Sequence, residues 1–295
     1  MSNSSMAIQI ENVCKNYGRH TVLENVSLNV GYGEIYGFLG LNGAGKSTTI
    51  KMLLAMIKPN AGSLCIMGEK VDAGNYKLWG NVGYLEDVTF YPNLTVMENL
   101  EISRRMQGIQ DKNSAAKVID KLKLNRYIHK KAKHLSLGNK QRLGLAKALI
   151  HNPKILILDE PINGLDPAGI VEIRELIRDL SFNFGVTVFM SSHLLEELSK
   201  LAVRIGIIHE GRLIEEIKAD DLEQELEKCL MLDGRDRESI KRILSDNGYK
   251  FEVDHHGFIK LTDETSVQNP QRLSELLVKS GQPPTMVNAV LLCLR

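Results

Sequence analysis

The chain is poor in cysteine and has no closely spaced cysteine pair. Its 295 residues include four cysteines, which are scattered along the sequence. Disulfide-stapled secreted domains and cysteine zinc sites both need several cysteines at short, regular spacings. We therefore expect incidental thiols in a reducing compartment, and neither a disulfide framework nor a cysteine metal site. The four are Cys14, Cys65, Cys229 and Cys293.

Long apolar runs are missing as well. Apolar runs such as residues 155–158 and 290–294 are far shorter than the roughly 20 apolar residues that a membrane-spanning helix needs. Residues 1–5 have neither the basic nor the apolar part of a signal peptide. If the protein works at a membrane, we expect it to do so by docking on another chain.

There is also no excess of charge of one sign. The sequence has 37 Lys and Arg against 36 Asp and Glu, so the formal net charge is +1. A total near zero gives no electrostatic reason to expect nucleic acid as a partner. Apolar residues make up 43% and charged residues 25%, as in ordinary globular proteins, and the length suffices for one large domain and a small one.

What the sequence does contain is a phosphate-binding loop. Residues 40–48 fit the pattern G-x-x-x-x-G-K-[ST], between an apolar strand candidate at 34–39 and an apolar helical pattern at 48–57. Glycines allow the backbone N–H groups to point into one concavity at a helix N-terminus, where phosphate oxygens are favoured. Lys46 adds a charge for the β- and γ-phosphates, and the Ser47 hydroxyl can bind Mg²⁺. The loop consists of Gly40, Leu41, Asn42, Gly43, Ala44, Gly45, Lys46, Ser47 and Thr48.

Two carboxylates follow a strongly apolar run. Residues 155–158 are continuously apolar, which is typical of a parallel strand buried on both faces, and Asp159 and Glu160 come directly after it. Acids at the end of a buried strand suggest a cation there, and in a P-loop protein that cation is Mg²⁺. We expect Asp159 to hold the ion and Glu160 to polarise the attacking water.

Three further segments have a weaker signal. His193 ends a buried strand candidate at 186–190, at the sheet edge where ligands bind, so it can reach a γ-phosphate. Tyr17, in a predicted turn, is equally consistent with core packing and with a stacking platform for a base. Ser136, taken alone, predicts only the start of a helix.

The coarse organisation is a β layer, a nucleotide core and an appendage. Alternating residues at 7–13 and 22–30 predict antiparallel strands before the P-loop, and residues 95 to about 150 read as mostly helical, opening with a capping box. From about residue 219 the composition becomes more charged. We expect a small α+β unit there, with a helix over 237–246 and a second over 269–279. His255 and His256 are better explained by a turn than by a metal site, because neighbours on a strand face opposite ways.

In this order, the motifs resemble the ATP-binding subunit of an ABC transporter, over about residues 6–218. Within that family the sequence is most similar to bacterial subunits that export bacitracin- or lantibiotic-type peptides and give self-protection. The motifs include residues 90–95, 136–138, 159–164 and 191–194. The resemblance implies an α/β fold: a P-loop, RecA-like ATPase core with an antiparallel β layer and a helical subdomain at about 89–150, plus the appendage at 219–295.

The resemblance also assigns roles to residues. It implies that Tyr17 stacks on adenine, that residues 40–48 are the Walker A loop, and that Asp159 belongs to Walker B. Glu160 becomes the catalytic carboxylate, with Lys46 and the switch histidine His193 beside it, and Asp166 closes the D-loop. The signature segment, which in the family contacts the ATP held by the other subunit, is Ser136, Leu137, Gly138 and Asn139.

Two motifs depart from the family pattern. In the usual signature, Leu-Ser-Gly-Gly-Gln, the third and fifth residues are here Leu137 and Asn139. The Q-loop glutamine is absent: counting back from Tyr91 favours Glu86 in its place, and counting forward from Tyr84 favours Asp87. Either acid could coordinate Mg²⁺. With Glu86 in the Q-loop place, the expected metal ligands are Ser47, Asp159 and Glu86. The extra negative charge, compared with glutamine, would affect both the affinity for the metal and the coupling to the membrane subunit.

The resulting expectation is an ATPase that uses ATP and Mg²⁺ and powers an exporter of an antimicrobial peptide or drug. We expect a homodimer closed over two ATP molecules and bound to an integral membrane permease, on the inner face of the cell membrane, without nucleic acid. The alternative is a non-transport ABC ATPase acting on the ribosome or DNA. Such proteins usually have two cassettes or a long coiled coil, whereas this chain has one P-loop and no heptad run.

Overall fold

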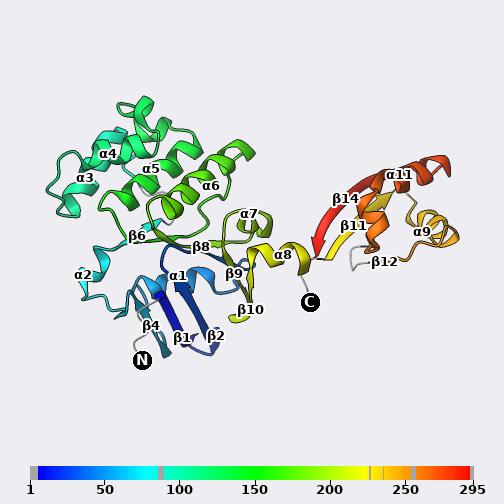
Figure 1. Cartoon of the computed structure of the whole chain (residues 1–295), viewed down its shortest axis with the longest axis horizontal. Helices are drawn as coiled ribbons and strands as arrows, with labels where there is room; N and C mark the ends of the chain where they lie inside the picture. The colour runs from blue at the N-terminus through cyan, green and yellow to red at the C-terminus, as the bar shows by residue number, and fades with distance from the viewer. Residues whose placement is uncertain (1–5, 86–89, 226, 235, 254–256, 293–295) are drawn as a thin grey trace. The chain divides into compact units, whose positions relative to one another are not determined.

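The computed structural model describes residues 6–85, 90–225, 227–234, 236–253 and 257–292. The chain divides into two compact units, with the boundary after Ala219 (Figure 1). Within the described residues, no helix is both long and apolar enough to cross a membrane.

The first unit contains two sheets. The antiparallel sheet has the order β2-β1-β4-β5, and the second sheet has the order β10-β9-β3-β8-β7-β6 with its inner strands parallel. Its strands are β1 (Met6–Tyr17), β2 (His20–Gly31), β3 (Ile35–Leu39), β4 (Ala61–Ile66), β5 (Glu69–Lys70), β6 (Val82–Leu85), β7 (Ile155–Leu158), β8 (Thr187–Ser192), β9 (Arg204–His209) and β10 (Arg212–Lys218).

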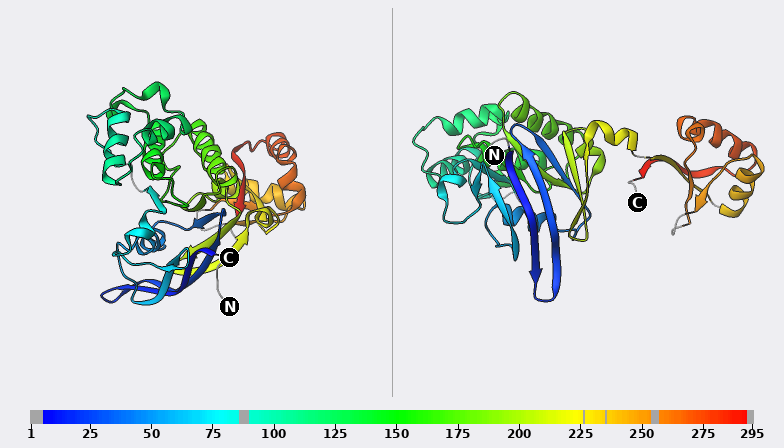
Figure 2. Two further views of the ribbon diagram at one scale, coloured as in Figure 1. Left: turned by 60° about the vertical axis from the view of Figure 1, so that its left-hand side comes forward. Right: turned by 60° about the horizontal axis from the view of Figure 1, so that its bottom comes forward.

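The antiparallel β layer predicted ahead of the P-loop is confirmed. β1 and β2 run side by side as the long blue strands of Figure 2. Their alternating apolar residues are buried, and helix α1 (Lys46–Leu53) contributes Ile50 and Leu53 to the same core as Ile8 on β1 and Ile157 on β7. That shared core places α1 between the two sheets, so the P-loop is held by both.

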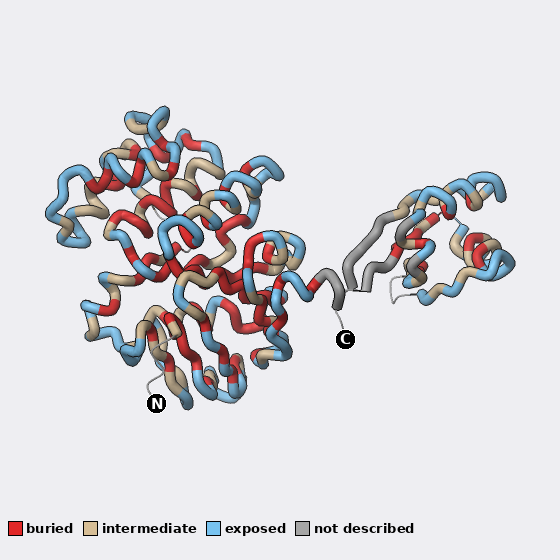
Figure 3. Tube along the Cα trace, viewed as in Figure 1, coloured by how far each residue is buried: buried red, intermediate tan, exposed pale blue. Residues whose placement is uncertain are grey.

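Continuous apolar runs form the buried strands of the second sheet. Every residue of β3, β7 and β8 is buried, as Figure 3 shows in red at the centre of the first unit. The parallel neighbours β3, β8 and β7 end at one edge of the sheet. The residues that follow them, at 40–45, 193 and 159–160, therefore meet at that edge.

The stretch predicted as mostly helical is confirmed. The capping box predicted at its start is present: Thr95 Oγ accepts from Glu98 N at 3.2 Å, and Glu98 Oε2 accepts from Thr95 N at 2.7 Å. The remaining helices of the unit are α2 (Tyr76–Trp79), α3 (Val96–Met106), α4 (Ser114–Lys121), α5 (Leu137–Leu149), α6 (Pro167–Phe182) and α7 (Leu195–Ser199), with 3₁₀ turns at Asn125–Tyr127 and Ala132–His134.

The second unit is a β-α-β-β-α-β arrangement. Its antiparallel sheet has the order β12-β13-β11-β14, the connectivity of a ferredoxin-like fold. Leu244 of one helix and Leu277 of another pack against Leu230 and Leu261 of the sheet. The elements are α8 (Ala219–Glu225), β11 (Glu227–Gly234), α9 (Arg237–Asp246), β12 (Glu252–Val253), β13 (Ile259–Leu261), α10 (Glu264–Gln268), α11 (Pro270–Lys279) and β14 (Pro284–Leu292).

The sequence predicted the two longer helices of this unit but missed one of its strands. The helix expected over 237–246 is α9, and the second is α11, which begins one residue later than expected because its N-cap is Asn269. Strand β14 was not predicted, since its pairing with β11, far away in the sequence, is what makes it a strand. His255 and His256 lie outside the described residues.

Candidate functional site

The P-loop leaves the sheet at the end of β3 and leads directly into α1. Gly43 and Gly45 have φ values of 85° and 111°, in the region that favours glycine. A Cβ on Gly45 would lie 2.5 Å from Leu23 Cδ2, and one on Gly40 would lie 2.6 Å from the Ile208 carbonyl oxygen. These two positions therefore require glycine because the neighbouring strands approach so closely.

The N-terminus of α1 is open to an anion. Its N-cap residue is Gly45, which forms no side-chain cap. The first N–H groups of a helix have no intrahelical acceptor, so a ligand can take them. At Gly43 there is no atom within 4 Å of a Cβ position, so the loop backbone is accessible at that residue. An uncapped helix N-terminus preceded by an accessible glycine loop suits phosphate oxygens.

Lys46 lies at the mouth of the loop with its ammonium group bound to the protein. It is 6% exposed, and its Nζ donates to Gly40 O at 2.6 Å and Leu41 O at 3.3 Å. The same Nζ lies 3.3 Å from Glu160 Oε1, an atom that makes no hydrogen bond among the described residues. Lys46 and Glu160 therefore neutralise each other electrostatically, in a contact that an incoming phosphate can replace.

The acidic pair leaves the sheet through an unusual backbone turn. Asp159 N still donates to Leu85 O of β6 at 2.8 Å, but Glu160 has a φ of 48°. A left-handed residue ends the alternation of the strand, which would otherwise send adjacent side chains to opposite faces. Both acidic residues then contact groups from β8 or the segment just after it.

His193 lies against the second oxygen of Glu160. Its Nδ1 is 2.9 Å from Glu160 Oε2, and the imidazole is about one third exposed. A carboxylate can only accept, so Nδ1 carries the proton in this contact and Nε2 is the acceptor when the ring is neutral. Glu160 is thus held between Lys46 on one oxygen and His193 on the other.

Sequence reasoning missed one residue of the site, Ser191. This buried residue of β8 donates from Oγ to Asp159 Oδ1 at 2.5 Å and accepts from Glu160 N at 3.0 Å. It therefore fixes both acidic residues at once. A signal was present, because three polar residues in a row end an apolar strand, but it indicated only the end of that strand.

We predict that Ser191→Ala lowers the rate of ATP hydrolysis about tenfold, because a hydrogen bond to a charged group contributes about 1.5–3 kcal/mol. The measurement is phosphate release by the purified protein. Thr187→Val is the matched control, since Thr187 lies at the other end of the same strand and accepts from Gly33 N at 2.9 Å. Equal loss in both variants would contradict a specific action of Ser191.

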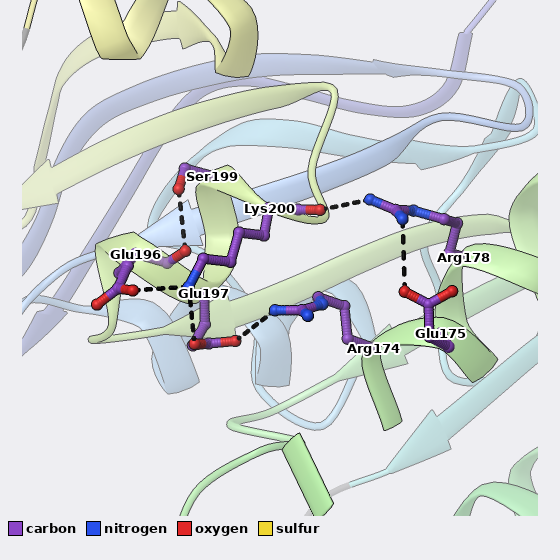
Figure 4. Close-up of polar contacts among 7 residues, drawn as sticks. All are labelled: Arg174, Glu175, Arg178, Glu196, Glu197, Ser199 and Lys200. Atoms are coloured by element: carbon purple, nitrogen blue, oxygen red, sulfur yellow. Dashed lines mark hydrogen bonds and ion pairs between the residues drawn. The ribbon is translucent and has the colours of Figure 1, made fainter. Parts of the chain in front are cut away.

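A network of charged residues holds the helix that follows His193. Arg174 of α6 pairs with Glu197 of α7 at 3.2 Å, and Glu197 also lies 3.6 Å from Lys200 Nζ (Figure 4). Arg178 donates to the Lys200 carbonyl oxygen at 2.7 Å. Asp166, which was predicted to close the D-loop, is the N-cap of α6, and α7 begins just after His193. The network therefore joins the two helices that follow these predicted site residues.

We predict that Arg174→Met destabilises the protein by about 1 kcal/mol and lowers hydrolysis about fivefold. The stability cost is small because Lys200 still neutralises Glu197, whereas the rate responds to looser placement of His193. Thermal unfolding and phosphate release measure the two effects. Glu175→Gln, which removes the exposed partner of Arg178, should leave the rate unchanged. A full-rate Arg174→Met protein would show that the network does not position His193.

The remaining predicted residues lie at helix starts or on the β layer. Ser136 caps α5, accepting from Asn139 N at 3.4 Å and from Asn139 Nδ2 at 2.9 Å, so Asn139 stabilises that cap. Asp166 caps α6 by accepting from Gly169 N at 3.1 Å. Tyr17 ends β1 with its ring half exposed, 5.1 Å from Lys15 Nζ.

The signature segment does not complete the P-loop of its own chain. Within the described residues, no hydrogen bond or ion pair joins residues 136–139 to the loop at 40–48. Gly138 faces open space, and Leu137 packs by Gly164, where a Cβ would lie 3.3 Å from Leu137 Cδ2. The leucine that departs from the family signature therefore rests on the loop ahead of α6. Glu86 and Asp87 lie outside the described residues.

Comparisons with known proteins give one consistent family. The model of the ABC transporter family matches residues 23–163. A bacitracin transport ATP-binding protein of Bacillus licheniformis is 40% identical over 280 residues, 94% of this chain and 91% of that protein. A lantibiotic transport ATP-binding protein of Streptococcus pyogenes is 39% identical, covering 73% of this chain and 93% of its own.

Solved structures give the same result. A dimeric ATP-binding cassette in a post-hydrolysis state, bound to ADP and Pi, has a TM-score of 0.64 and 28% identity, covering 72% of this chain and 98% of the cassette. An ATP-binding subunit of an ABC transporter has a TM-score of 0.65 and 27% identity, covering 74% of this chain and 92% of that chain.

Proposed function

This chain belongs to the ATP-binding subunits of ABC transporters, and we propose that it powers export of an antimicrobial peptide or related drug through a separate permease. The relatives named above are peptide-antibiotic transport proteins, and the one from Bacillus licheniformis matches both units of this chain. That match supports the cargo class. No finding favours the alternative of action on the ribosome or DNA.

The observation that carries the hydrolytic mechanism is the position of Glu160 between Lys46 and His193. When ATP is bound, the α1 amides and Lys46 bind its phosphates. Because Lys46 then has a new anionic partner, Glu160 Oε1 is released to accept a proton from water. The water oxygen forms a bond to the γ-phosphorus as the bond to the bridging oxygen breaks, and ADP leaves.

The other site residues orient the reacting groups. Ser47, Asp159 and Glu86 are the proposed Mg²⁺ ligands, and the ion would neutralise charge on the phosphates. Ser191 fixes the Asp159 carboxylate, and His193 holds Glu160 through Nδ1. Tyr17 would stack on the adenine ring, which its half-exposed surface allows.

We further propose that the second half of each site comes from a second copy. Ser136 and Gly138 do not contact the P-loop of their own chain but lie at an exposed helix start, where a partner's γ-phosphate could be received. ATP binding then closes a head-to-tail dimer, and hydrolysis reopens it against the permease on the inner face of the membrane.

Mixing two inactive variants tests this arrangement. Ser136→Arg blocks the signature segment and Lys46→Met disables the P-loop, so each homodimer should hydrolyse less than about 1% of the normal amount. In a mixed dimer, one site receives the intact P-loop of one chain and the intact signature of the other. The mixture should show about a quarter of the activity of the same amount of wild-type protein, because half of the dimers are mixed and one of the two sites in each mixed dimer works. Purely additive activity on mixing would contradict shared sites.

A further inference from the structure

A second cavity lies at the end of the parallel strands opposite to the P-loop. Its volume is about 290 Å³, and it lies among one side of α4 with the loop before it, the segment leading into β7 and the segment leading into β8. The candidate nucleotide site follows the carboxyl ends of β3, β7 and β8, whereas this cavity precedes the amino ends of β7 and β8. The residues that matter are Asp111, Ser114, Lys117, Lys121, Lys154 and Phe184.

The wall of this cavity has an excess of positive charge. It includes three lysines and one carboxylate, that of Asp111, which is paired with Lys117 Nζ at 2.8 Å. Lys121 and Lys154 form no ion pair among the described residues, although Asp179 attracts the Lys121 ammonium from nearby. Two cationic side chains are thus left for an anion that enters the cavity.

Lys121 is partly withdrawn from water. Its Nζ lies 3.3 Å from the centre of the Phe184 ring, and burial lowers the pKa of its ammonium group. A cation that has lost part of its hydration gains more from an anionic partner than one in bulk water. Phe184, by contrast, is 55% exposed and offers an apolar surface beside the charged groups.

Ser114 provides an independent sign of a missing partner. It is the first residue of α4 and only 7% exposed, and its Oγ has no hydrogen-bond partner among the described residues. The N-cap residue Asn113 makes no side-chain cap either. The backbone N–H groups here do have partners, since Ser114 N donates to Asp111 O at 3.2 Å and Asn113 N to Asp111 Oδ1 at 2.9 Å. The Ser114 hydroxyl is therefore the group left without one, and a buried hydroxyl is costly to leave unpaired.

We propose that this cavity binds a phosphate or phosphomonoester dianion, held by Lys121, Lys154 and the Ser114 hydroxyl at the start of α4. Lysine binds phosphate well as a compact point charge, and the cavity is at the small end of the range for ligand sites. The part of the Phe184 ring that Lys121 does not cover is exposed and can receive the first carbons of an attached organic group. The site uses no residue of the P-loop, so it stands whether or not the proposed transport function holds.

Calorimetric titration of the full chain tests the site. The P-loop is first saturated with Mg²⁺ and a non-hydrolysable ATP analogue, whose γ-phosphate excludes free phosphate from that loop. Inorganic phosphate and glycerol 3-phosphate are then titrated separately. We expect saturable binding by at least one probe, weakened about tenfold by Lys154→Gln and by Ser114→Ala, because each variant removes a hydrogen bond to a charged group.

The controls separate a specific site from general surface charge. Lys112→Gln removes an exposed lysine from the same loop but outside the cavity, so it should bind as wild type does. Unfolding curves verify that all variants are folded. If Ser114→Ala is unstable, Lys154→Gln still tests the site, because Lys154 is exposed and its substitution should not disturb folding. Vesicles with phosphatidic acid, compared with phosphatidylcholine alone, distinguish a lipid headgroup from a free ligand. Failure of all three probes to saturate, or equal binding by wild type and the two cavity variants, would overturn the proposal.

Discussion

A Glu160→Gln protein is expected to bind ATP normally and to hydrolyse it about a hundred to a thousand times more slowly than wild type. Glutamine has nearly the same shape but cannot accept a proton from the attacking water. The two contacts of Glu160, with Lys46 at 3.3 Å and His193 at 2.9 Å, show how closely the carboxylate is held. Phosphate release under saturating ATP measures the rate.

The same variant should collect as an ATP-bound dimer, because hydrolysis is the step that reopens it. Size-exclusion chromatography with and without ATP detects this change in mass. Glu69→Gln is the control, since Glu69 is an exposed residue of strand β5. A Glu160→Gln protein that hydrolyses ATP at the normal rate would remove Glu160 from the mechanism.

Lys46→Met is expected to weaken ATP binding about tenfold to a hundredfold, and to abolish measurable hydrolysis at cellular ATP concentrations. Methionine keeps much of the length of lysine but loses the charge that binds the β- and γ-phosphates, and each charge-assisted hydrogen bond contributes about 1.5–3 kcal/mol. The side chain is only 6% exposed, so solvent screens this interaction little. Titration with a fluorescent ATP analogue measures the affinity.

The control for this variant is Lys58→Met. Lys58 is exposed beyond the C-terminal end of α1, where its ammonium cannot reach the loop, so nucleotide affinity should remain at the wild-type value. Unfolding curves are needed for both variants, because Lys46 also donates to Gly40 O and Leu41 O in the nucleotide-free protein. Wild-type affinity in a folded Lys46→Met protein would show that this lysine does not bind the phosphates.

Features encoded by nearby residues were predictable. The capping box of Thr95 and Glu98 forms within one helical turn, and the strand–loop–helix context of the P-loop depends on adjacent segments. The apolar run ahead of Asp159 forms a fully buried strand for the reason expected, since both of its faces are covered. In each case a few neighbouring residues determine the geometry, so spacing along the chain is sufficient information.

Other features depend on segments that meet only after folding. Nothing in the spacing of the chain says that β8 lies between β3 and β7, yet that order brings Ser191 onto Asp159 and His193 onto Glu160. Strand β14 likewise owes its existence to pairing with β11. Strand order follows from which apolar surfaces pack best in three dimensions, and periodicity does not reveal it.

The sequence by itself determined the family, the phosphate-binding loop and the identity of the acidic pair, because local backbone geometry requires those residue types at those spacings. Only the tertiary structure decided that Lys46 neutralises Glu160 before nucleotide arrives, and that Ser191 fixes both acids. It also brought Lys154, just ahead of β7, to the same cavity as Ser114 and Lys121 of α4. Contacts of this kind join residues far apart in the chain, and packing of the sheet and helices alone selects them.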